Sequence, residues 1–270
     1  MTAEQNPVIR VESDGPLRIV TLNRPETMNA FDREMQAELP RVLTAIGQDR
    51  EARAVVLTGA GRAFSAGGDI ANFPLNRADL YHRRAGLREG RRLFDELISL
   101  HLPVVAAVNG PAVGLGCTVA TACDIVFMAE DAFLADPHVT VALVAGDGGA
   151  VTWPSLTSLL KAKQYLLTGD RMPAREALAI GMANFVVPAG ELMDAATAFA
   201  RRLASLPPQA VQDTKLVLNQ LLRERAASVL PFGLAAESQS SDTVEYAEAP
   251  AKFEAERAAR RASRGNGAGS

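Results

Sequence analysis

The stretch PVVAAVNGPAVGLGCTVATACDIVFMA at residues 103–129 decides the fold of this chain. It begins and ends with short apolar runs, PVVAAV and DIVFMA, which have the length of β-strands covered on both faces. Between them lie a turn punctuated by glycines and a series of small residues, which indicates a short helix packed close to the strands. The stretch therefore predicts a strand–turn–helix–strand unit, as found in α/β cores.

The residues before this stretch show the same alternation of strands and helices. Short β-branched runs at Val8–Val11 and Leu17–Leu22, joined by SDGP, predict a β-hairpin. Residues 33–46 have a helical pattern, although Pro40 is expected to kink or interrupt the helix. The run AVVLTG at 54–59 predicts another strand that is buried on both faces.

Helical patterns dominate the second half of the chain. Residues 91–100 place apolar side chains on one helical face, and after Val187 the sequence is helical in pattern almost throughout. The final residues are rich in Gly and Ser and poor in hydrophobic residues, which is typical of a disordered tail. We therefore expect an α/β core over residues 1–190, a helical C-terminal region over 191–262 and a disordered tail over 263–270.

The composition is that of a globular enzyme and argues against several other classes of protein. Of the 270 residues, 48 % are apolar and 22 % are charged, and the formal net charge is −3. The lysines and arginines are scattered except at the extreme C-terminus, so no nucleic-acid-binding surface is expected. The long apolar region is interrupted by Asn109, by glycines and by Asp124, and therefore indicates buried core rather than a membrane span.

Two further features favour a cytoplasmic protein. The first twenty residues are polar and contain acidic side chains early, unlike a signal peptide. Cys117 and Cys123 have no third partner and no metal-ligand spacing, so we interpret them as buried free thiols in a reducing compartment. For the same reason we expect no metal site.

Two glycine-rich turns, GAGRAFSAGGDI at 59–70 and NGPAVGLGC at 109–117, each follow an expected buried strand. Neither matches the glycine patterns of nucleotide-binding loops. Tight packing is one explanation for glycines at such turns, but two of these turns at neighbouring strand ends favour a shared site lined by backbone. Backbone N–H groups in that place are suited to an oxyanion hole, which binds a carbonyl oxygen as negative charge develops on it.

These turns belong to four motifs by which the chain resembles the enoyl-CoA hydratase/isomerase (crotonase) superfamily over essentially its whole length. The motifs are LNRPETMNAF at 22–31, AVVLTGAGRAFSAGGDI at 54–70, PVVAAVNGPAVGLGCTVATACDIVFMAEDAFL at 103–134 and LLTGDRMPAREALAIGMANFVVP at 166–188. The resemblance implies an α/β fold built as a spiral of ββα repeats, with a helical C-terminal region used for trimerisation. It also implies trimers, or hexamers formed by two trimers, and an acyl-CoA thioester substrate whose coenzyme A replaces any separate cofactor.

The resemblance also places the binding residues. It implies that the oxyanion donors are the N–H groups of Gly68 and Leu115. Asp69 has a second explanation, as the cap of the following helix. The remaining residues implied for substrate and coenzyme A binding, the last two from a loose match, are Met28, Ala30, Ala66, Gly67, Asp69, Ile70, Gly114, Phe253 and Arg257.

The chain departs from the superfamily at the residues that perform the hydratase reaction. A typical hydratase has two glutamates that hold the water and transfer its proton, and this chain has Thr118 and His138 at those positions. A threonine hydroxyl cannot accept a proton near neutral pH, whereas a histidine has a pKa suited to acid–base catalysis. The usual two-glutamate mechanism is therefore not expected here.

His138 and Asp147 are expected to form a catalytic dyad instead. The segment PHVTVALVAGDGG at 137–149 and the later LPFGLAAES, which contains Glu237, resemble the β-diketone hydrolases related to 6-oxocamphor hydrolase. In that branch a histidine and an aspartate activate water, and a glutamate completes the polar site. Alternatively, His138 is a core histidine bonded to a backbone carbonyl, and Asp147 caps the next helix. His82 is expected to lie in a polar, mobile loop without a catalytic role.

Three functions are compatible with these residues. We expect an enzyme of the enoyl-CoA hydratase/isomerase type that stabilises an enolate or related oxyanion with Gly68 and Leu115, with hydration or its reverse as the leading reaction. Hydrolytic carbon–carbon cleavage of a β-dicarbonyl compound is the alternative, favoured by the loss of both glutamates. A catalytically silent homologue that binds RNA or a protein partner is a third, and the acidic net charge argues against it.

Overall fold

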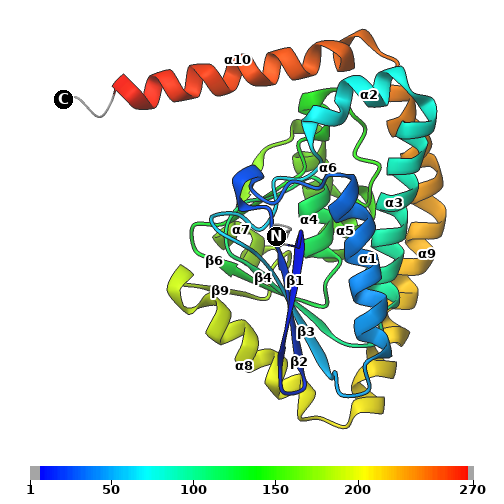
Figure 1. Cartoon of the computed structure of the whole chain (residues 1–270), viewed down its shortest axis with the longest axis vertical. Coiled ribbons are helices and arrows are strands. Elements are labelled where there is room, and N and C mark those ends of the chain that lie inside the picture. The colour runs from blue at the N-terminus through cyan, green and yellow to red at the C-terminus, as the bar shows by residue number, and fades with distance from the viewer. Residues whose placement is uncertain (1–6, 267–270) are drawn as a thin grey trace, which may run out of the picture.

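A six-stranded sheet in the order β1-β2-β3-β4-β6-β9 lies at the centre of the molecule (Figure 1). The computed structural model describes residues 7–266, of which 256–266 are described by their backbone alone. β1 and β2 pair antiparallel, and each later pair of neighbours in this sheet is parallel. A second sheet has the order β5-β7-β8. The strands are β1 (Ile9–Asp14), β2 (Leu17–Leu22), β3 (Ala54–Gly59), β4 (Val104–Val108), β5 (Ala112–Val113), β6 (Ile125–Ala129), β7 (Phe133–Ala135), β8 (Arg171–Pro173) and β9 (Phe185–Val187).

The strands of the central sheet lie where the apolar runs predict them. β3 and β4 are buried at every position, which confirms the interpretation of AVVLTG and VVAAV as strands covered on both faces. The hairpin is also confirmed, with Asp14 opposite Leu17 and Ile9 opposite Leu22. Gly15 occupies the turn with φ +57°, a conformation that glycine adopts without strain.

Helices cover the sheet and extend beyond it (Figure 1). The α-helices are α1 (Arg33–Gln48), α2 (Phe73–Ala78), α3 (Leu80–Ser99), α4 (Leu115–Thr121), α5 (Gly149–Leu156), α6 (Leu159–Thr168), α7 (Ala174–Ala179), α8 (Leu192–Ala204), α9 (Pro208–Ser240) and α10 (Val244–Asn266). Short 3₁₀ turns are η1 (Pro25–Thr27), η2 (Ile70–Asn72), η3 (His138–Val141) and η4 (Ala189–Glu191). The alternation of strands and helices confirms the predicted α/β class.

Helix α1 continues through Pro40, contrary to the predicted interruption. Proline lacks the N–H that would bond to the carbonyl group one turn earlier, so its presence inside a helix is unfavourable. Met35, Leu39 and Leu43 of the same helix are fully buried in the core, and this packing outweighs the local cost. The expectation of an interruption was wrong because it used only the local preference of proline.

The C-terminal region is helical, as the sequence indicates. Helix α8 packs against β3 and β4, and α9 packs against α3 and α5. Helix α10 contacts α2 and η3 and then projects away from the rest of the molecule (Figure 1). It reaches Asn266, into the segment 263–270 that the composition indicates as a tail, while residues 267–270 lie outside the described part of the chain. No described helix is both long and apolar enough to cross a membrane.

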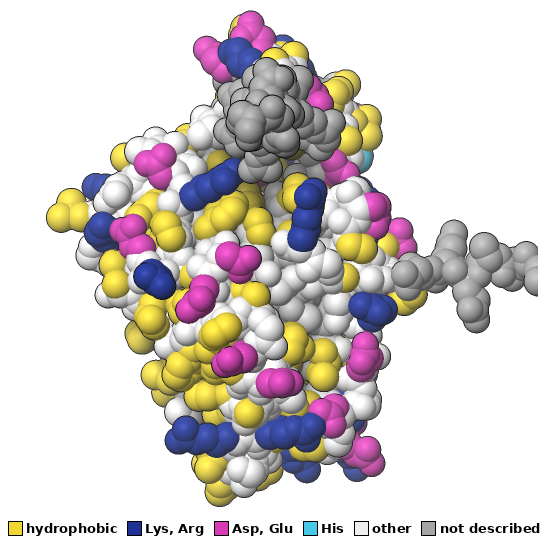
Figure 2. All heavy atoms as spheres, turned by 90° about the vertical axis from the view of Figure 1, so that its left-hand side faces the viewer, with side chains coloured by type: hydrophobic (Ala, Val, Ile, Leu, Met, Phe, Trp, Pro, Cys, Tyr) yellow, Lys and Arg dark blue, Asp and Glu magenta, His cyan; other side chains and the backbone are white. Residues whose placement is uncertain are grey.

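Both cysteines are free, as predicted, with Cys117 buried and Cys123 half-buried. The surface itself carries large hydrophobic side chains. Figure 2 shows one face of the molecule, where hydrophobic side chains lie among charged ones. The most exposed of the large hydrophobic side chains on α6 and α9 are Leu160, Leu167, Val217, Leu218, Leu221 and Phe232.

A buried ion pair ties α9 to the central sheet. Lys215 Nζ lies 2.7 Å from Asp124 Oδ2 and donates to the carbonyl group of Leu102 at 2.8 Å. Asp124 also accepts a hydrogen bond from the N–H of Val104, at the start of β4, at 2.7 Å. Burial raises the pKa of Asp124, and the Lys215 ammonium opposes that rise. The lysine therefore compensates a carboxylate that is poorly solvated in the fold.

Replacing Lys215 by methionine is expected to lower the free energy of unfolding by about 3 kcal/mol, because the Asp124 carboxylate then stays buried without its cation. Urea denaturation measures the change. Lys161→Met provides the control, since Lys161 and Glu176 form a 3.2 Å pair with side chains 39 % and 35 % exposed. That variant should lose less than about 1 kcal/mol. Equal losses in the two variants would contradict a special role for the buried pair.

Candidate active site

The two glycine-rich turns lie side by side and form a miniature parallel pairing. Ser65 is bridged to Ala112, the N–H of Ser65 donates to the Pro111 carbonyl at 3.0 Å, and the N–H of Val113 donates to the Ser65 carbonyl at 2.9 Å. Gly67 has φ +87°, and a Cβ atom at this position would lie 2.5 Å from the Val113 carbonyl oxygen. Only glycine fits there, so it permits the close approach of the two turns.

This approach leaves two backbone N–H groups available at one edge of the pairing. The bridge between Phe31 and Gly68 uses the N–H groups of Phe31 and Asp69, at 2.7 and 3.1 Å, and not that of Gly68. Leu115 is the first residue of α4, where a helix has no internal partner for its N–H. Among the described residues, neither the N–H of Gly68 nor that of Leu115 takes part in a hydrogen bond.

A cavity of about 130 Å³ collects the residues that the sequence predicts as catalytic. Gly68 comes from the first glycine turn, Leu115 from the start of α4, and Glu237 from α9. His138 opens η3, and Asp147 lies just before α5. All five line the same cavity. Residues separated by more than 160 positions in the sequence thus share one chamber.

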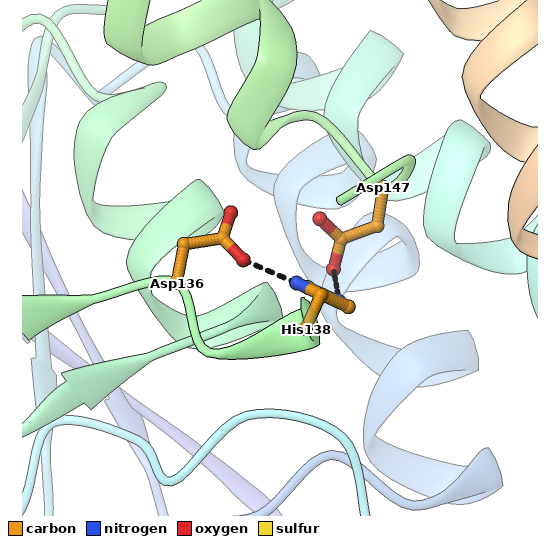
Figure 3. A group of neighbouring side chains, drawn as sticks. All are labelled: Asp136, His138 and Asp147. Atoms are coloured by element: carbon orange, nitrogen blue, oxygen red, sulfur yellow. Dashed lines mark hydrogen bonds and ion pairs between the residues drawn. The ribbon is translucent and has the colours of Figure 1, made fainter. Parts of the chain in front are cut away.

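His138 lies between two carboxylates (Figure 3). Its Nδ1 is hydrogen-bonded to Oδ1 of Asp136, and its Nε2 lies 3.4 Å from Oδ2 of Asp147. Asp147 Oδ1 also accepts a hydrogen bond from the Thr118 hydroxyl at 3.2 Å. The imidazole therefore pairs with carboxylates rather than with a backbone carbonyl. His138 therefore contacts Asp147 and a second carboxylate, that of Asp136.

Asp136 is the residue that sequence reasoning missed. It is fully buried and precedes His138 by two positions, directly after β7. The signal was present as DPH, because an aspartate so close to a candidate catalytic histidine is able to reach its ring. Whether it does so depends on the turn at Pro137, which the sequence does not specify.

The environment fixes the charges of this cluster. Burial by itself lowers the pKa of His138, but the carboxylates of Asp136 and Asp147 outweigh it and hold that pKa well above its ordinary value. Burial likewise raises the pKa of Asp147, but His138 and the hydrogen bonds to the carboxylate lower it further than burial raises it. Near neutral pH, therefore, His138 is an imidazolium and Asp147 a carboxylate.

Glu237 has the opposite behaviour. Burial, followed by the nearby Asp147 carboxylate, raises the pKa of Glu237 to about 8. Its Oε2 atom is buried and has no hydrogen-bond partner in the described structure. Glu237 is consequently a neutral carboxylic acid at pH 7, able to donate a proton into the cavity.

Asp136, His138 and Asp147 also offer three possible metal-ligand atoms within 4.8 Å of one another. The two ring nitrogens of His138, however, face different carboxylates (Figure 3). A single ion bound by one ring nitrogen would therefore leave Asp136 or Asp147 on the far side of the ring. The arrangement favours an ion-paired imidazolium over chelation of one metal by all three side chains.

The segments implied for coenzyme A binding are docked onto each other. Met28 and Asn29 both have positive φ angles, and the N–H of Ala66 donates to the Met28 carbonyl at 2.9 Å. The buried Asn29 side chain donates to the carbonyl groups of Ala60 and Ala63 at 2.9 and 2.8 Å. This brings Met28 and Ala30 next to the turn that contains Ala66, Gly67, Asp69 and Ile70.

Three other predicted residues lie in different surroundings. Asp69 caps η2 by accepting from the Ala71 N–H at 3.0 Å, which confirms its structural explanation, and it also lines the cavity. Phe253 lies on α10 and is not among the residues that line this cavity. The side chain of Arg257, on the same helix, lies outside the described residues.

The prediction that His82 lies in a loop was wrong. The residue lies in the first turn of α3, whose start is capped by Asp79, and it lines the same cavity as His138. Its Nε2 atom is buried and has no hydrogen-bond partner in the described structure. The polar sequence around it concealed a helix, because the apolar face of α3 begins only later, around Leu93.

Comparison with known proteins gives consistent matches. The family model described as Enoyl-CoA hydratase/isomerase matches residues 12–259. The chain is 35 % identical over 251 residues to the short-chain-enoyl-CoA hydratase of Clostridium acetobutylicum, covering 93 % of this chain and 95 % of that protein. It is 34 % identical over 225 residues to the crotonyl-CoA hydratase of Syntrophomonas wolfei, covering 82 % and 86 %. A crystal structure of an enoyl-CoA hydratase/isomerase from Mycobacterium paratuberculosis matches with a TM-score of 0.88 and 46 % identity, covering 92 % of this chain and 99 % of that chain.

Replacing Asp136 by asparagine is expected to lower the pKa of His138, because one of the two carboxylates that favour the imidazolium is lost. A raised histidine pKa stabilises the fold fully below the unfolded value, about 6.5, and this contribution disappears as the pH rises through the folded value. The variant should therefore lose more stability at pH 6 than in alkaline solution. NMR titration of the His138 ring and urea denaturation at both pH values measure these effects.

Asp131→Asn is the matched control, since it removes the same charge from an exposed position between β6 and β7. It should leave the His138 titration unchanged. An Asp136→Asn variant in which His138 titrates as in the original protein would show that Asp136 does not hold the imidazolium.

Proposed function

The chain belongs to the enoyl-CoA hydratase/isomerase family, and on this premise we propose that it adds water to the double bond of an enoyl-CoA thioester, or removes it in the reverse direction. One observation carries the proposal: the unused N–H groups of Gly68 and Leu115 and the cluster of His138, Asp147 and Glu237 line a single cavity. The chain is therefore an enoyl-CoA hydratase-like enzyme that acts on acyl-CoA.

The thioester carbonyl oxygen is bound by the N–H groups of Gly68 and Leu115. When a nucleophile adds to the β-carbon, negative charge moves onto this oxygen and an enolate forms. Two fixed donors stabilise the enolate more than the starting thioester, and removal of one such donor typically slows a reaction by about 10²–10³-fold. The N-terminus of α4 adds a partial positive charge on the same side.

The side-chain cluster supplies the proton transfers. Water adds its oxygen to the β-carbon and gives a proton to Asp147, the ionised carboxylate, which His138 and Thr118 hold in place. Glu237, protonated at neutral pH, then donates its proton to the α-carbon as the enolate collapses. A proton passing from Asp147 back to Glu237 restores the starting state. This assignment replaces the two glutamates of a typical hydratase with two carboxyl groups held at different pKa values.

Hydrolytic carbon–carbon cleavage of a β-dicarbonyl compound is a second candidate. The pairing of His138 with Asp147, with Glu237 on the same cavity wall, supports it, because such a cluster is also able to activate water for attack on a carbonyl carbon. The high pKa of His138 weighs against it, since an imidazolium must first lose its proton to act as a base. A silent homologue that binds RNA or protein gains no support from a cavity built of acid–base groups.

We also propose that the protein assembles as trimers, or as hexamers formed by two trimers. Helix α9 carries exposed leucines, and two of them, Leu218 and Leu221, are 61 % and 62 % exposed. Apolar side chains at neighbouring helical positions are costly to leave in water, and a symmetric contact between copies of the chain buries them.

Replacing His138 by alanine, or Asp147 by asparagine, is expected to lower kcat at least about 100-fold, because the first change removes the imidazolium that holds the base and the second removes the base itself. The affinity for coenzyme A should stay nearly unchanged. The double variant should be little slower than either single variant, since the two side chains act together. Turnover is measured by mass spectrometry with a panel of enoyl-CoA and 3-oxoacyl-CoA thioesters.

The products separate the candidate functions, because hydration adds the mass of water to one product whereas cleavage yields two. Val139→Ala is the control, since Val139 follows His138 on η3 but is 38 % exposed. Full activity in both His138→Ala and Asp147→Asn would contradict the proposed role of these two residues in proton transfer. If calorimetry shows no binding at millimolar coenzyme A, a free β-diketone becomes the favoured substrate.

Light scattering at micromolar protein concentration is expected to give the mass of a trimer or hexamer. Leu218→Glu should shift the mass towards the monomer, because it places a charge within the buried contact. A monomer in the unmodified protein would refute the proposed assembly.

A further inference from the structure

One wall of the cavity has no part in the proposed reaction. Arg33 at the start of α1 and the neighbouring residues His82 and Arg83 on α3 form this polar wall. A cavity that receives only a hydrocarbon acyl chain gains nothing from cationic and imidazole side chains, because burying polar groups without partners is costly. The polar wall therefore needs a separate explanation.

Arg83 carries an orphaned donor. The residue is only 8 % exposed, and its Nη1 and Nη2 donate to the two carboxylate oxygens of Asp242 at 2.8 and 3.2 Å. Asp242 is 64 % exposed, so it holds the guanidinium from the solvent side. The Nε atom is buried and has no hydrogen-bond partner in the described structure. An unsatisfied buried donor is unfavourable by about 1–3 kcal/mol, and such donors call for a ligand or another functional reason.

His82, next to Arg83 in the sequence, also has a side-chain nitrogen atom without a hydrogen-bond partner in the described structure. Its Nε2 atom is also buried and without a partner among the described residues, and its carbonyl oxygen accepts a hydrogen bond from Arg33 Nη2. Both residues line the one cavity, so each of these nitrogen atoms is a candidate contact for ligand oxygen atoms there. Arg33 is half-buried and has no carboxylate partner among the ion pairs of the described residues.

The charges around the polar wall favour an anion. Asp147 is paired with His138, and Glu237 is neutral at pH 7. Asp242 is already used by Arg83, and Asp69 caps η2 while facing the same cavity. The Asp79 carboxylate also lies near His82, but it caps the start of α3. Arg33 forms no ion pair among the described residues, and it lies beside nitrogen atoms that have no hydrogen-bond partner there.

We propose that the polar wall binds a carboxylate on the acyl group, so that the substrate is a coenzyme A monothioester of a dicarboxylic acid. This inference rests on the proposed function, because it places the thioester at Gly68 and Leu115. The carboxylate accepts hydrogen bonds from Arg83 Nε and His82 Nε2 while Arg33 supplies the balancing charge. A site built to hydrogen-bond a substrate group discriminates strongly against an analogue that lacks it.

The test compares two saturated thioesters of equal chain length that cannot be hydrated, the glutaric acid monothioester of coenzyme A and pentanoyl-CoA. Titration calorimetry should show about 10- to 100-fold tighter binding of the glutaric monothioester, the range expected for hydrogen bonds to a charged group. Arg83→Met should remove most of this preference and leave the affinity for pentanoyl-CoA nearly unchanged. His82→Leu is a second, separate variant, and it should also reduce the preference for the glutaric monothioester.

Arg77→Met is the matched control, because Arg77 of α2 donates to the carbonyl groups of Ser241 and Thr243 next to Asp242 but does not line the cavity. It should keep the full preference. Equal binding of both thioesters by the unmodified protein would overturn the carboxylate site and leave the proposed function standing. If neither thioester binds, the proposed function fails and the carboxylate site falls with it. An equal loss for both ligands in Arg83→Met would make Arg83 a structural residue only.

Discussion

Gly67 lies so close to the Val113 carbonyl oxygen that any larger residue would push the two glycine turns apart. The site depends on this contact, because the pairing of Ser65 with Ala112 fixes the position of Gly68 relative to the start of α4. The central parallel sheet delivers both turns from the same edge, since parallel strands end on one side. Close backbone approach then provides two donors without any side chain, which makes their positions insensitive to most substitutions around them.

The second constraint is the burial of charge. Asp136, His138 and Asp147 sit together where an isolated charge would be unstable, and each is compensated by its neighbours. Burial, and next to it the nearby Asp147 carboxylate, keeps Glu237 protonated in the same cavity. Asp147 and Glu237, two carboxyl groups in one cavity, therefore differ in ionisation. This difference is what gives the cavity both an acid and a base near neutral pH.

Helix α9 connects this chemistry to the stability of the fold. Near its start Lys215 pairs with Asp124, and the Asn219 side chain donates to the Ile98 carbonyl at 2.9 Å. Near its end Glu237 faces the cavity, and the turn that follows supplies Asp242 to Arg83. A single helix that is anchored by buried polar contacts at one end thus positions an acid and part of the polar wall at the other. The coupling depends on side chains that lie far apart in the sequence and meet only in the folded chain.

The sequence by itself determined the elements and the backbone part of the site. Apolar runs predicted the buried strands, and glycine-rich turns after two of them predicted the place where Gly68 and Leu115 lie, because these signals are local. His138, Asp147 and Glu237 could be singled out only because the resemblance supplied their spacing. Tertiary structure alone decided that Asp136 joins His138, that His82 belongs to a helix facing the cavity, and that Arg83 meets Asp242 from 159 positions away. Burial and pairing across such separations are properties of the packed chain, and no local pattern encodes them.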